Sequence, residues 1–403
     1  MRKPELLAPA GDMERLRMAI AYGADAVYLA GERFGMRSFA GNFGEAELTQ
    51  AVELCRAHGV AVHITCNTMP RNEEIAALPA FLEQLEELRV DAIILADLGV
   101  LALAKRYAPW VNIHISTQAG VVNAGAAAAW HELGASRVIL ARELSLSEIG
   151  EIRARAPGAL ELEVFVHGAM CVSHSGRCLL SNYMTGRDAN RGACAQPCRY
   201  QYALMEEKRP GEYYPIFEED GDTFILNARD LCMIDHLEDL INLGVDSLKI
   251  EGRAKSAYYA AIVTGAYHHG LEAALKGMPL DPLWREEVEK VSHRPYSTGF
   301  FYGEPGQHTK DVQYLRDWQV VALVEDCDEE GLATLSLRNK FTQGDEIELV
   351  GPGVKPIAFT APLMETLEGE ALEEPRHPQM KFRMRLPVKV PPLSLIRICR
   401  PNV

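Results

Sequence analysis

A short apolar pattern recurs through the first 250 residues and constrains the fold more than any other feature of this chain. It reads "GADAVYLAG" from Gly23, "RVDAIILAD" from Arg89, "GASRVILAR" from Gly134 and "GVDSLKIEG" from Gly244. Such runs, which start at a turn and end in polar residues, are typical of strands buried on both faces. Amphipathic stretches such as "EAELTQAVELCRAHG" lie between them and predict helices. Strands that alternate with helices predict parallel strands joined by right-handed crossovers.

Eight such strands can be placed, which favours an α/β fold of the TIM (β/α)8 barrel type over about residues 1–274. The strands are expected near residues 5–8, 25–30, 60–66, 91–96, 111–116, 136–141, 161–166 and 246–250. A doubly wound sheet is the competing fold, and it usually carries a glycine-rich phosphate turn after its first strand. Here that turn reads "APAGD", and G-x-G-x-x-G occurs nowhere in the sequence, so we prefer the barrel.

Four cysteines follow the seventh predicted strand directly, in a long insertion at about residues 168–235. Cys171, Cys178, Cys194 and Cys198 have the spacing C-x6-C-x15-C-x3-C. The active sites of TIM barrels lie at the C-terminal ends of the strands, so these cysteines should lie at the mouth of the site. The N-terminus lacks the apolar core of a secretion signal and no apolar run is long enough to span a bilayer, so we expect a cytoplasmic protein with reduced thiols.

Clustered cysteines in a reducing compartment predict a metal site, and spacing alone leaves both an iron–sulfur cluster and zinc open. The position beside a catalytic mouth favours the iron–sulfur cluster. Cys232, which also falls in the insertion, is an alternative ligand. Cys55 and Cys66 are expected in the core.

Polar residues at the other strand ends are candidates for binding or catalysis. They are Asn67, Gln118, Asn123, Arg142, Glu143, His167, Lys249, Glu251 and Arg253. The cationic ones, Arg142, Lys249 and Arg253, can clamp a carboxylate or a phosphate. The alternative is a structural ring of ion pairs, such as Arg253 with Glu143. His167 can be an acid–base group, a substrate ligand or a buried structural histidine.

The pattern changes after residue 316, where short alternating strands are separated by turn signals. We expect residues 275–316 to connect the barrel to a small β-barrel domain at 317–403. The net charge is −15, but the stretch "KFRMRLPVKV" would present Lys381, Arg383 and Arg385 on one face of a strand. A local basic surface for nucleic acid is one interpretation, and scattered solvated side chains are the other.

The segment "EVFVHGAMCVSHSGRCLLS" resembles the signature of the collagenase-like peptidase family, whose catalytic type is unknown. The matching residues are Glu163, Phe165, Gly168, Cys171, Gly176, Cys178 and Ser181. The resemblance continues through "GRDANRGACAQPCRYQY", "SLKIEGRAKSAYY" and "NKFTQGDEIELVGPG", and it covers nearly the whole chain. It is strongest to the branch of the family that hydroxylates tRNA.

The resemblance implies oxygen-atom insertion on a TIM-barrel body, not proteolysis. It implies hydroxyuridine formation at the wobble position of tRNA, with prephenate as co-substrate. A 4Fe–4S cluster would be bound by Cys171, Cys178, Cys194 and Cys198, with Cys232 outside that four-cysteine pattern. The C-terminal segment is similar to an elongation-factor β-barrel, which suits RNA. A paralogous chain is a possible partner, whereas a membrane and DNA are not expected.

Other functions remain open at this stage. One is hydroxylation of an rRNA base or a quinone precursor, and another is an RNA-binding module with structural zinc. A peptidase has the least support, because the sequence has neither H-E-x-x-H nor G-x-S-x-G.

Overall fold

The computed structural model describes residues 2–36, 41–171, 178, 180–197, 229–303, 305 and 314–401. Between 198 and 228 it describes only the backbone of four short strands, β8 (Leu204–Met205), β9 (Tyr213–Tyr214), β10 (Phe217–Glu219) and β11 (Asp222–Phe224). None of the described helices is long and apolar enough to cross a membrane.

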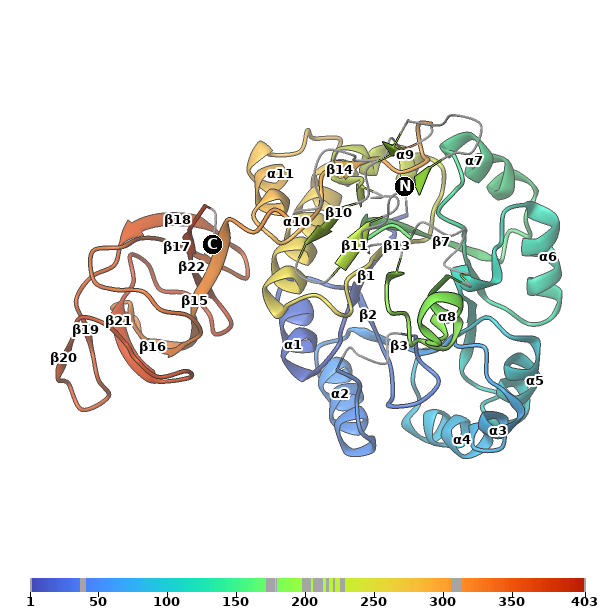
Figure 1. The fold of residues 1–403 in the computed structure, drawn as a ribbon, viewed down its shortest axis with the longest axis horizontal. Coiled ribbons are helices and arrows are strands. Elements are labelled where there is room, and N and C mark those ends of the chain that lie inside the picture. The colour runs from blue at the N-terminus through green and yellow to red at the C-terminus, as the bar shows by residue number, and fades with distance from the viewer. Residues whose placement is uncertain are drawn as a thin grey trace.

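Eight parallel strands form a closed barrel, which confirms the predicted fold class (Figure 1). They are β1 (Glu5–Pro9), β2 (Ala26–Leu29), β3 (Ala61–Cys66), β4 (Ala92–Leu95), β5 (Asn112–Ile115), β6 (Arg137–Ile139), β7 (Glu161–Gly168) and β13 (Ser247–Ile250). Each strand pairs with its neighbour in sequence, and β13 pairs with both β1 and β7 to close the ring. All eight lie where the apolar runs predicted them.

Helices surround the barrel, and side-chain caps fix where several of them begin (Figure 1). They are α1 (Met13–Ala21), α2 (Glu45–Ala57), α3 (Asn72–Ile75), α4 (Leu78–Leu88), α5 (Leu98–Tyr107), α6 (Ala124–Glu132), α7 (Leu146–Arg155), α9 (Leu237–Asn242) and α10 (Ala257–Leu275). The Asp12 carboxylate accepts the Arg15 amide at the start of α1, and Asp97 does the same for Gly99 in α5. At α7, Ser145 and Glu148 form a capping box.

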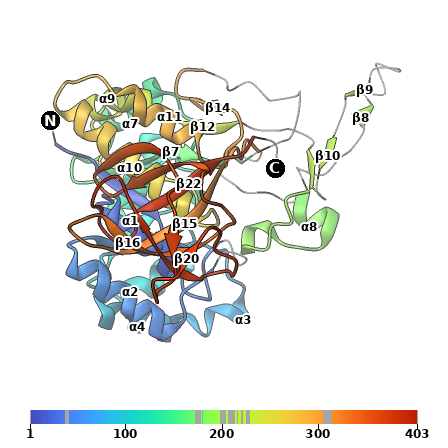
Figure 2. The same ribbon diagram turned by 90° about the vertical axis from the view of Figure 1, so that its left-hand side faces the viewer.

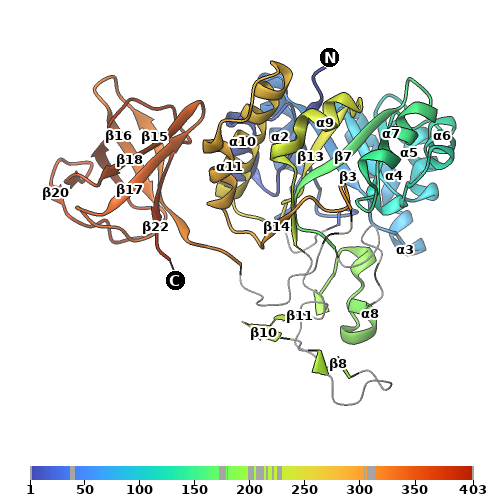
Figure 3. The ribbon, with the colours of Figure 1, turned by 90° about the horizontal axis from the view of Figure 1, so that it is seen from above.

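The insertion leaves the barrel after β7 and returns to the same strand. On its return, β12 (Asp230–Cys232) pairs antiparallel with the end of β7, and β14 (Tyr296–Ser297) pairs with β12. Between these points, α8 (Leu180–Thr185) and the short strands stand out from one end of the barrel (Figures 2 and 3). The predicted connecting segment also contains α11 (Pro282–Glu289), which packs on α10.

The C-terminal region forms a separate antiparallel sheet, as the alternating pattern predicted. Its strands run in the order β18 (Val354–Thr360), β17 (Glu346–Gly351), β22 (Leu395–Cys399), β15 (Trp318–Cys327), β16 (Leu332–Leu337), β21 (Lys381–Arg385), β19 (Met364–Glu365) and β20 (Ala371–Leu372). The sheet curls around an apolar core of its own, which includes Phe341 and Phe382. It lies beside α1, α10 and α11 (Figure 1).

A buried ion network joins the two domains. The guanidinium of Arg397 from β22 contacts both carboxylate oxygens of Glu287 in α11 at 2.7 Å. It also donates to Glu348 of β17 and to the hydroxyl of Tyr258 in α10. Because these partners come from both domains, the network fixes the sheet against the barrel.

Candidate active site

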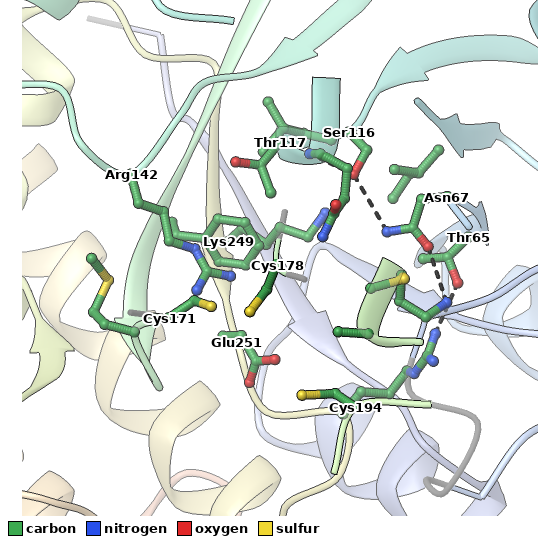
Figure 4. Close-up of a pocket in the computed structure, with 18 of the residues that line it drawn as sticks. Thr65, Asn67, Ser116, Thr117, Arg142, Cys171, Cys178, Cys194, Lys249 and Glu251 are labelled. Carbon is green, nitrogen blue, oxygen red and sulfur yellow. Dashed lines mark hydrogen bonds between the residues drawn. The ribbon is translucent and has the colours of Figure 1, made fainter. Parts of the chain in front are cut away.

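A pocket of about 160 Å³ opens at the C-terminal ends of the barrel strands. Side chains from β2, β3, β4, β6, β7 and β13 form its floor and walls, and residues of the insertion cover it (Figure 4). Seven of the nine candidates at the strand ends line it, namely Asn67, Gln118, Arg142, Glu143, Lys249, Glu251 and Arg253. In contrast, Asn123 caps α6 by accepting the Ala126 amide at 2.8 Å.

One wall of the pocket is lined by amide and hydroxyl groups. Asn67 donates from Nδ2 to Ser116 Oγ at 3.4 Å and accepts the Met36 amide at Oδ1 (Figure 4). Ser116 Oγ also accepts the backbone amide of Gln118. These contacts hold Asn67 and Gln118 against one side of the cavity, where their amides offer donors and acceptors to a ligand.

Two arginines of the pocket are each held by a neighbouring group. The Arg142 guanidinium carbon lies 3.9 Å from the centre of the Phe165 ring, and Nη1 donates to the Ala169 carbonyl at 2.9 Å. Arg253 is 3% exposed and donates from Nη1 to Thr65 Oγ1 at 2.8 Å. Stacking and hydrogen bonding hold both side chains in place, which suits a binding site for a planar anion.

Lys249 projects from β13 into the floor of the pocket and has a buried partner. Its Nζ lies 2.8 Å from Glu163 Oε1, and the other Glu163 oxygen accepts from Arg137 at 3.1 Å. Arg137 in turn binds Glu5 and Glu161 at the opposite end of the barrel. The interior therefore holds a ladder of alternating charges that the sequence analysis did not predict. Its one sequence signal is the glutamates that interrupt the apolar run of β7.

Burial and pairing act in opposite directions on this ladder. Burial lowers the pKa of Lys249 by more than the Glu163 charge raises it, so the pKa lies below its usual value. Burial alone would raise the pKa of Glu163, but the charges of Lys249 and Arg137 outweigh it and the pKa is lowered. The Glu163 carboxyl is therefore ionised at neutral pH.

Three of the four predicted cluster ligands line the same pocket. Cys171 is exposed, while Cys178 and Cys194 are half-buried. Backbone amides two residues further on donate to two of the sulfurs, from Leu180 to Cys178 at 3.3 Å and from Gln196 to Cys194 at 3.4 Å. Cys198, the fourth predicted ligand, lies outside the described residues.

The cysteine segment is held by residues that were not predicted to belong to the site, although Ser181 belongs to the matching signature. Asn190 accepts the Cys178 amide and donates to the Cys178 carbonyl. The hydroxyl of Ser181 accepts the Ala195 amide at 2.9 Å. Arg191 reaches Glu74 of α3 at 2.7 Å and so ties the insertion to the barrel. These contacts fix the backbone around two of the thiols.

The described thiols fit an iron–sulfur cluster in chemistry and surroundings. Cysteine thiolates are its usual ligands, and amide N–H groups aimed at the sulfurs are the contacts that tune it. No three described His, Cys, Asp or Glu side chains converge closely enough to bind a single metal ion. A four-iron cluster takes one thiolate per iron, so its ligands need not converge on one point.

Cys232, the alternative ligand, lies in the core rather than in the pocket. It is 7% exposed, and burial raises the pKa of its thiol to about 11. The hydroxyl of Tyr267 contacts its sulfur at 3.9 Å. Cys66 is also buried, with its pKa raised to about 12. A thiol with so high a pKa is protonated at neutral pH, which disfavours metal binding.

His167 does not line the pocket, although its position at the end of β7 predicted that it would. It is 1% exposed, and its ring nitrogens lie 3.2 Å from the Tyr267 hydroxyl and 3.3 Å from the Tyr296 hydroxyl. The register of β13 against β7 shifts between Lys249 and Ile250, so that Ile250 pairs with His167. Burial lowers its pKa well below the usual value, so the ring is neutral and structural.

Gly168 links His167 to the cysteine segment, and its backbone requires glycine. Its φ is +104°, and a Cβ there would lie 2.6 Å from the Glu251 carbonyl oxygen. We expect Gly168→Ala to lower the free energy of unfolding by about 1–3 kcal/mol. Chemical denaturation tests this, with Gly158→Ala as the control because a Cβ at Gly158 meets open space. Equal losses in the two variants would contradict the expectation.

The predicted basic face of the C-terminal domain is largely paired with acids. Lys381 lies 2.7 Å from Glu325, and Arg383 lies 3.9 Å from Glu365. Arg385, the third residue of that face, donates to the backbone carbonyl of Glu330. These pairs reduce the positive potential of this face. Its attraction for phosphate groups is therefore weaker than its three cations alone would give.

The chain matches known proteins along almost its whole length. The model of peptidase family U32 matches residues 11–311, and that of the family's C-terminal domain matches residues 316–397. The tRNA hydroxylation protein P1 of Bacillus subtilis is 38% identical over 98% of this chain and 95% of its own. The tRNA hydroxylation protein P of Escherichia coli is 36% identical over 96% and 94%. The 23S rRNA 5-hydroxycytidine C2501 synthase of Escherichia coli is 35% identical over 68% of this chain and 40% of its own.

Proposed function

The chain belongs to peptidase family U32, and from that premise we propose that it is an RNA hydroxylase that acts on tRNA. The proteins named for tRNA hydroxylation match it over nearly their full length, including the C-terminal domain. The match to the rRNA hydroxycytidine synthase covers less of both chains. This difference in coverage favours tRNA over rRNA.

The specific reaction that we propose is formation of hydroxyuridine at the wobble position, with prephenate as co-substrate. Anticodon-loop bases are unstacked easily, so a single base can enter a pocket of this kind. Asn67 and Gln118 present amide groups that complement the carbonyl and N–H groups of a uracil edge. Phe165 and Tyr28 supply apolar surface for the ring.

The cations of the pocket are the proposed binding groups for the carboxylates of prephenate. Arg142 and Lys249 lie close together in the pocket (Figure 4), and Arg253, which donates to Thr65, lines it as well. Two separated cationic groups suit a dicarboxylate better than a neutral ligand. The pocket can therefore hold the co-substrate next to the base.

A 4Fe–4S cluster on Cys171, Cys178, Cys194 and Cys198 is part of the same proposal. When bound, such a cluster supplies one-electron chemistry. The observation that carries the proposal is that three of these thiols line the pocket that holds the cations and the amide wall. A cofactor on them would lie beside the substrates, and the insertion would shield both from water.

A peptidase or a zinc-containing RNA-binding module has less support from the pocket. Among its described lining residues there is no histidine to activate a cysteine nucleophile. A purely structural zinc site would also not use the cations of the pocket to bind a ligand. A quinone precursor as substrate would not pair its own groups with these cations as the two carboxylates of a dicarboxylate can.

Nucleoside mass spectrometry of tRNA from a strain lacking this gene and any paralogue tests the proposal. We expect hydroxyuridine derivatives at the wobble position to disappear, and plasmid-borne wild-type protein to restore them. The variant Arg142→Met should fail to restore them, because it keeps the contact with Phe165 but loses the charge. Hydroxycytidine is measured in the rRNA of the same cells. Loss of hydroxycytidine from rRNA, with tRNA nucleosides unchanged, would show that the substrate is rRNA and not tRNA.

A further inference from the structure

Lys249 occupies an unusual environment for a lysine in the floor of a pocket. Its side chain is 5% exposed, and its nitrogen lies 4.6 Å from the centre of the Tyr28 ring and 5.4 Å from that of Phe165. Two aromatic rings and the barrel interior thus keep water from the amine while the pocket gives a ligand access. A desolvated lysine in such a place is a nucleophile toward carbonyl carbon.

The amine has a base at hydrogen-bond distance, and the base has an orienting group. Glu163 Oε1 lies 2.8 Å from Nζ, close enough to take and return a proton. Arg137 holds the other Glu163 oxygen at 3.1 Å and is itself fixed by Glu161 at 2.8 Å. Nucleophile, base and orienting group therefore stand in a row, as covalent catalysis requires.

A cation next to the amine indicates which carbonyl compound fits. The Arg142 guanidinium stacks on the same Phe165 ring at 3.9 Å, so it is a near neighbour of Lys249 (Figure 4). A carboxylate bound to Arg142 would place an adjacent carbonyl group toward the amine. A carboxylate bonded directly to a ketone carbon is the defining feature of a 2-oxo acid.

We propose that Lys249 forms an imine with the ketone of a 2-oxo acid, a reaction that rests on the proposed function because prephenate belongs to this class. The nitrogen attacks the ketone carbon after Glu163 has taken one proton from the ammonium group, and a second proton passes from the nitrogen to the former carbonyl oxygen, which becomes a hydroxyl. Glu163 then returns the proton to the hydroxyl of the adduct, which leaves as water. Ammonium and ketone thus give a protonated imine and one water, with no oxidant or reductant.

The test is reductive trapping on the anaerobically purified full-length protein. Pyruvate or prephenate is added with cyanoborohydride, which converts an imine into a stable secondary amine, and peptide mass spectrometry locates the adduct. We expect near-complete modification of Lys249. We also expect the initial rate to fall about 10²-fold in Glu163→Gln, because the proton carrier is lost.

Two lysine variants are the controls. Lys249→Arg keeps a positive charge opposite Glu163 but cannot form an imine, so its peptide should stay unmodified. Lys255 is a half-buried lysine with a pKa lowered by desolvation, but it binds the Ser292 carbonyl outside the pocket. Lys255→Arg should therefore leave the trapping unchanged.

Two further results would contradict the proposal that Lys249 forms an imine. One is the absence of an adduct on wild-type Lys249, and the other is equal modification of Lys249 and Lys255. Neither result bears on tRNA hydroxylation, which is read from nucleosides. Conversely, the adduct could form on Lys249 while deletion of the gene leaves the tRNA nucleosides unchanged. That result would support the imine and contradict the proposed function.

Discussion

Replacing Arg397 by alanine is expected to lower the free energy of unfolding by about 3–5 kcal/mol. The Arg397 side chain is 0% exposed, and Glu287, which it binds through two hydrogen bonds, is 1% exposed. The substitution would leave the Glu287 carboxylate buried with much of its compensating charge removed. Since the partners come from both domains, we also expect the C-terminal sheet to separate from the barrel before the barrel unfolds.

The same network predicts how stability depends on pH. Burial alone would raise the pKa of the Glu348 carboxyl. The charges of Arg397 and Lys290 lower this pKa by more, so it lies below its usual value. A depressed folded-state pKa gives stability that is present above the unfolded-state pKa and lost as pH falls through the folded-state value. The difference between wild type and Arg397→Ala should therefore shrink below about pH 4.

Urea denaturation at neutral and acidic pH, followed by tryptophan fluorescence, measures both effects. Trp318 is a reporter of the network because its ring lies 4.9 Å from the Arg397 guanidinium carbon. Lys381→Ala is the matched control, since its 2.7 Å pair with Glu325 is 54% and 33% exposed. Such a pair contributes about 0–1 kcal/mol. A loss in Arg397→Ala no larger than in this control would show that the network does not hold the domains together.

Arg397→Lys separates charge from geometry in this network. It keeps a positive charge near Glu287 but cannot make two parallel hydrogen bonds to the carboxylate. We expect its free energy of unfolding to lie between those of the wild type and Arg397→Ala. This variant also tests the network if the alanine variant does not fold.

The barrel could be predicted from sequence because its strands are buried on both faces. Each strand is then a short apolar run, as "AVYL" of β2 and "AIIL" of β4 show, and the runs can be counted. The position of the pocket could be predicted from the same set of strands. The C-terminal strand ends of a barrel converge, so Asn67, Arg142 and Lys249 were expected to lie together although they are far apart in sequence.

What the sequence did not predict depends on which way a side chain faces and on contacts across the barrel. His167 and Lys249 both stand at strand ends, but Lys249 lines the pocket, whereas His167 lies against Tyr267 and Tyr296 where the register between β7 and β13 shifts. The charge ladder joins Glu5, Arg137 and Glu163, whose pairing requires the closed barrel. Asn190 is a polar residue in a loop, and no local pattern marks its two bonds to Cys178.

Replacing Cys178 and Cys194 together by alanine is expected to remove all cluster iron. The wild-type protein, purified without oxygen, should contain about four irons and four acid-labile sulfides per chain. The double variant should contain essentially none, because two of four thiolates cannot hold the cluster. Metal analysis and the visible absorption spectrum measure this directly. Wobble hydroxyuridine should disappear in cells that carry only the variant.

Controls in the other cysteines decide which thiols are ligands. Cys399 is exposed in the C-terminal domain, so Cys399→Ala should keep the full iron content. Cys232→Ala should keep it as well, because burial and the contact with Tyr267 hold Cys232 as a neutral thiol in the core. Loss of iron in Cys232→Ala, with circular dichroism unchanged, would make that residue a ligand. One zinc and no sulfide in the wild-type protein would contradict the cluster and leave the fold unaffected, because the strands of the barrel close without the cysteine segment.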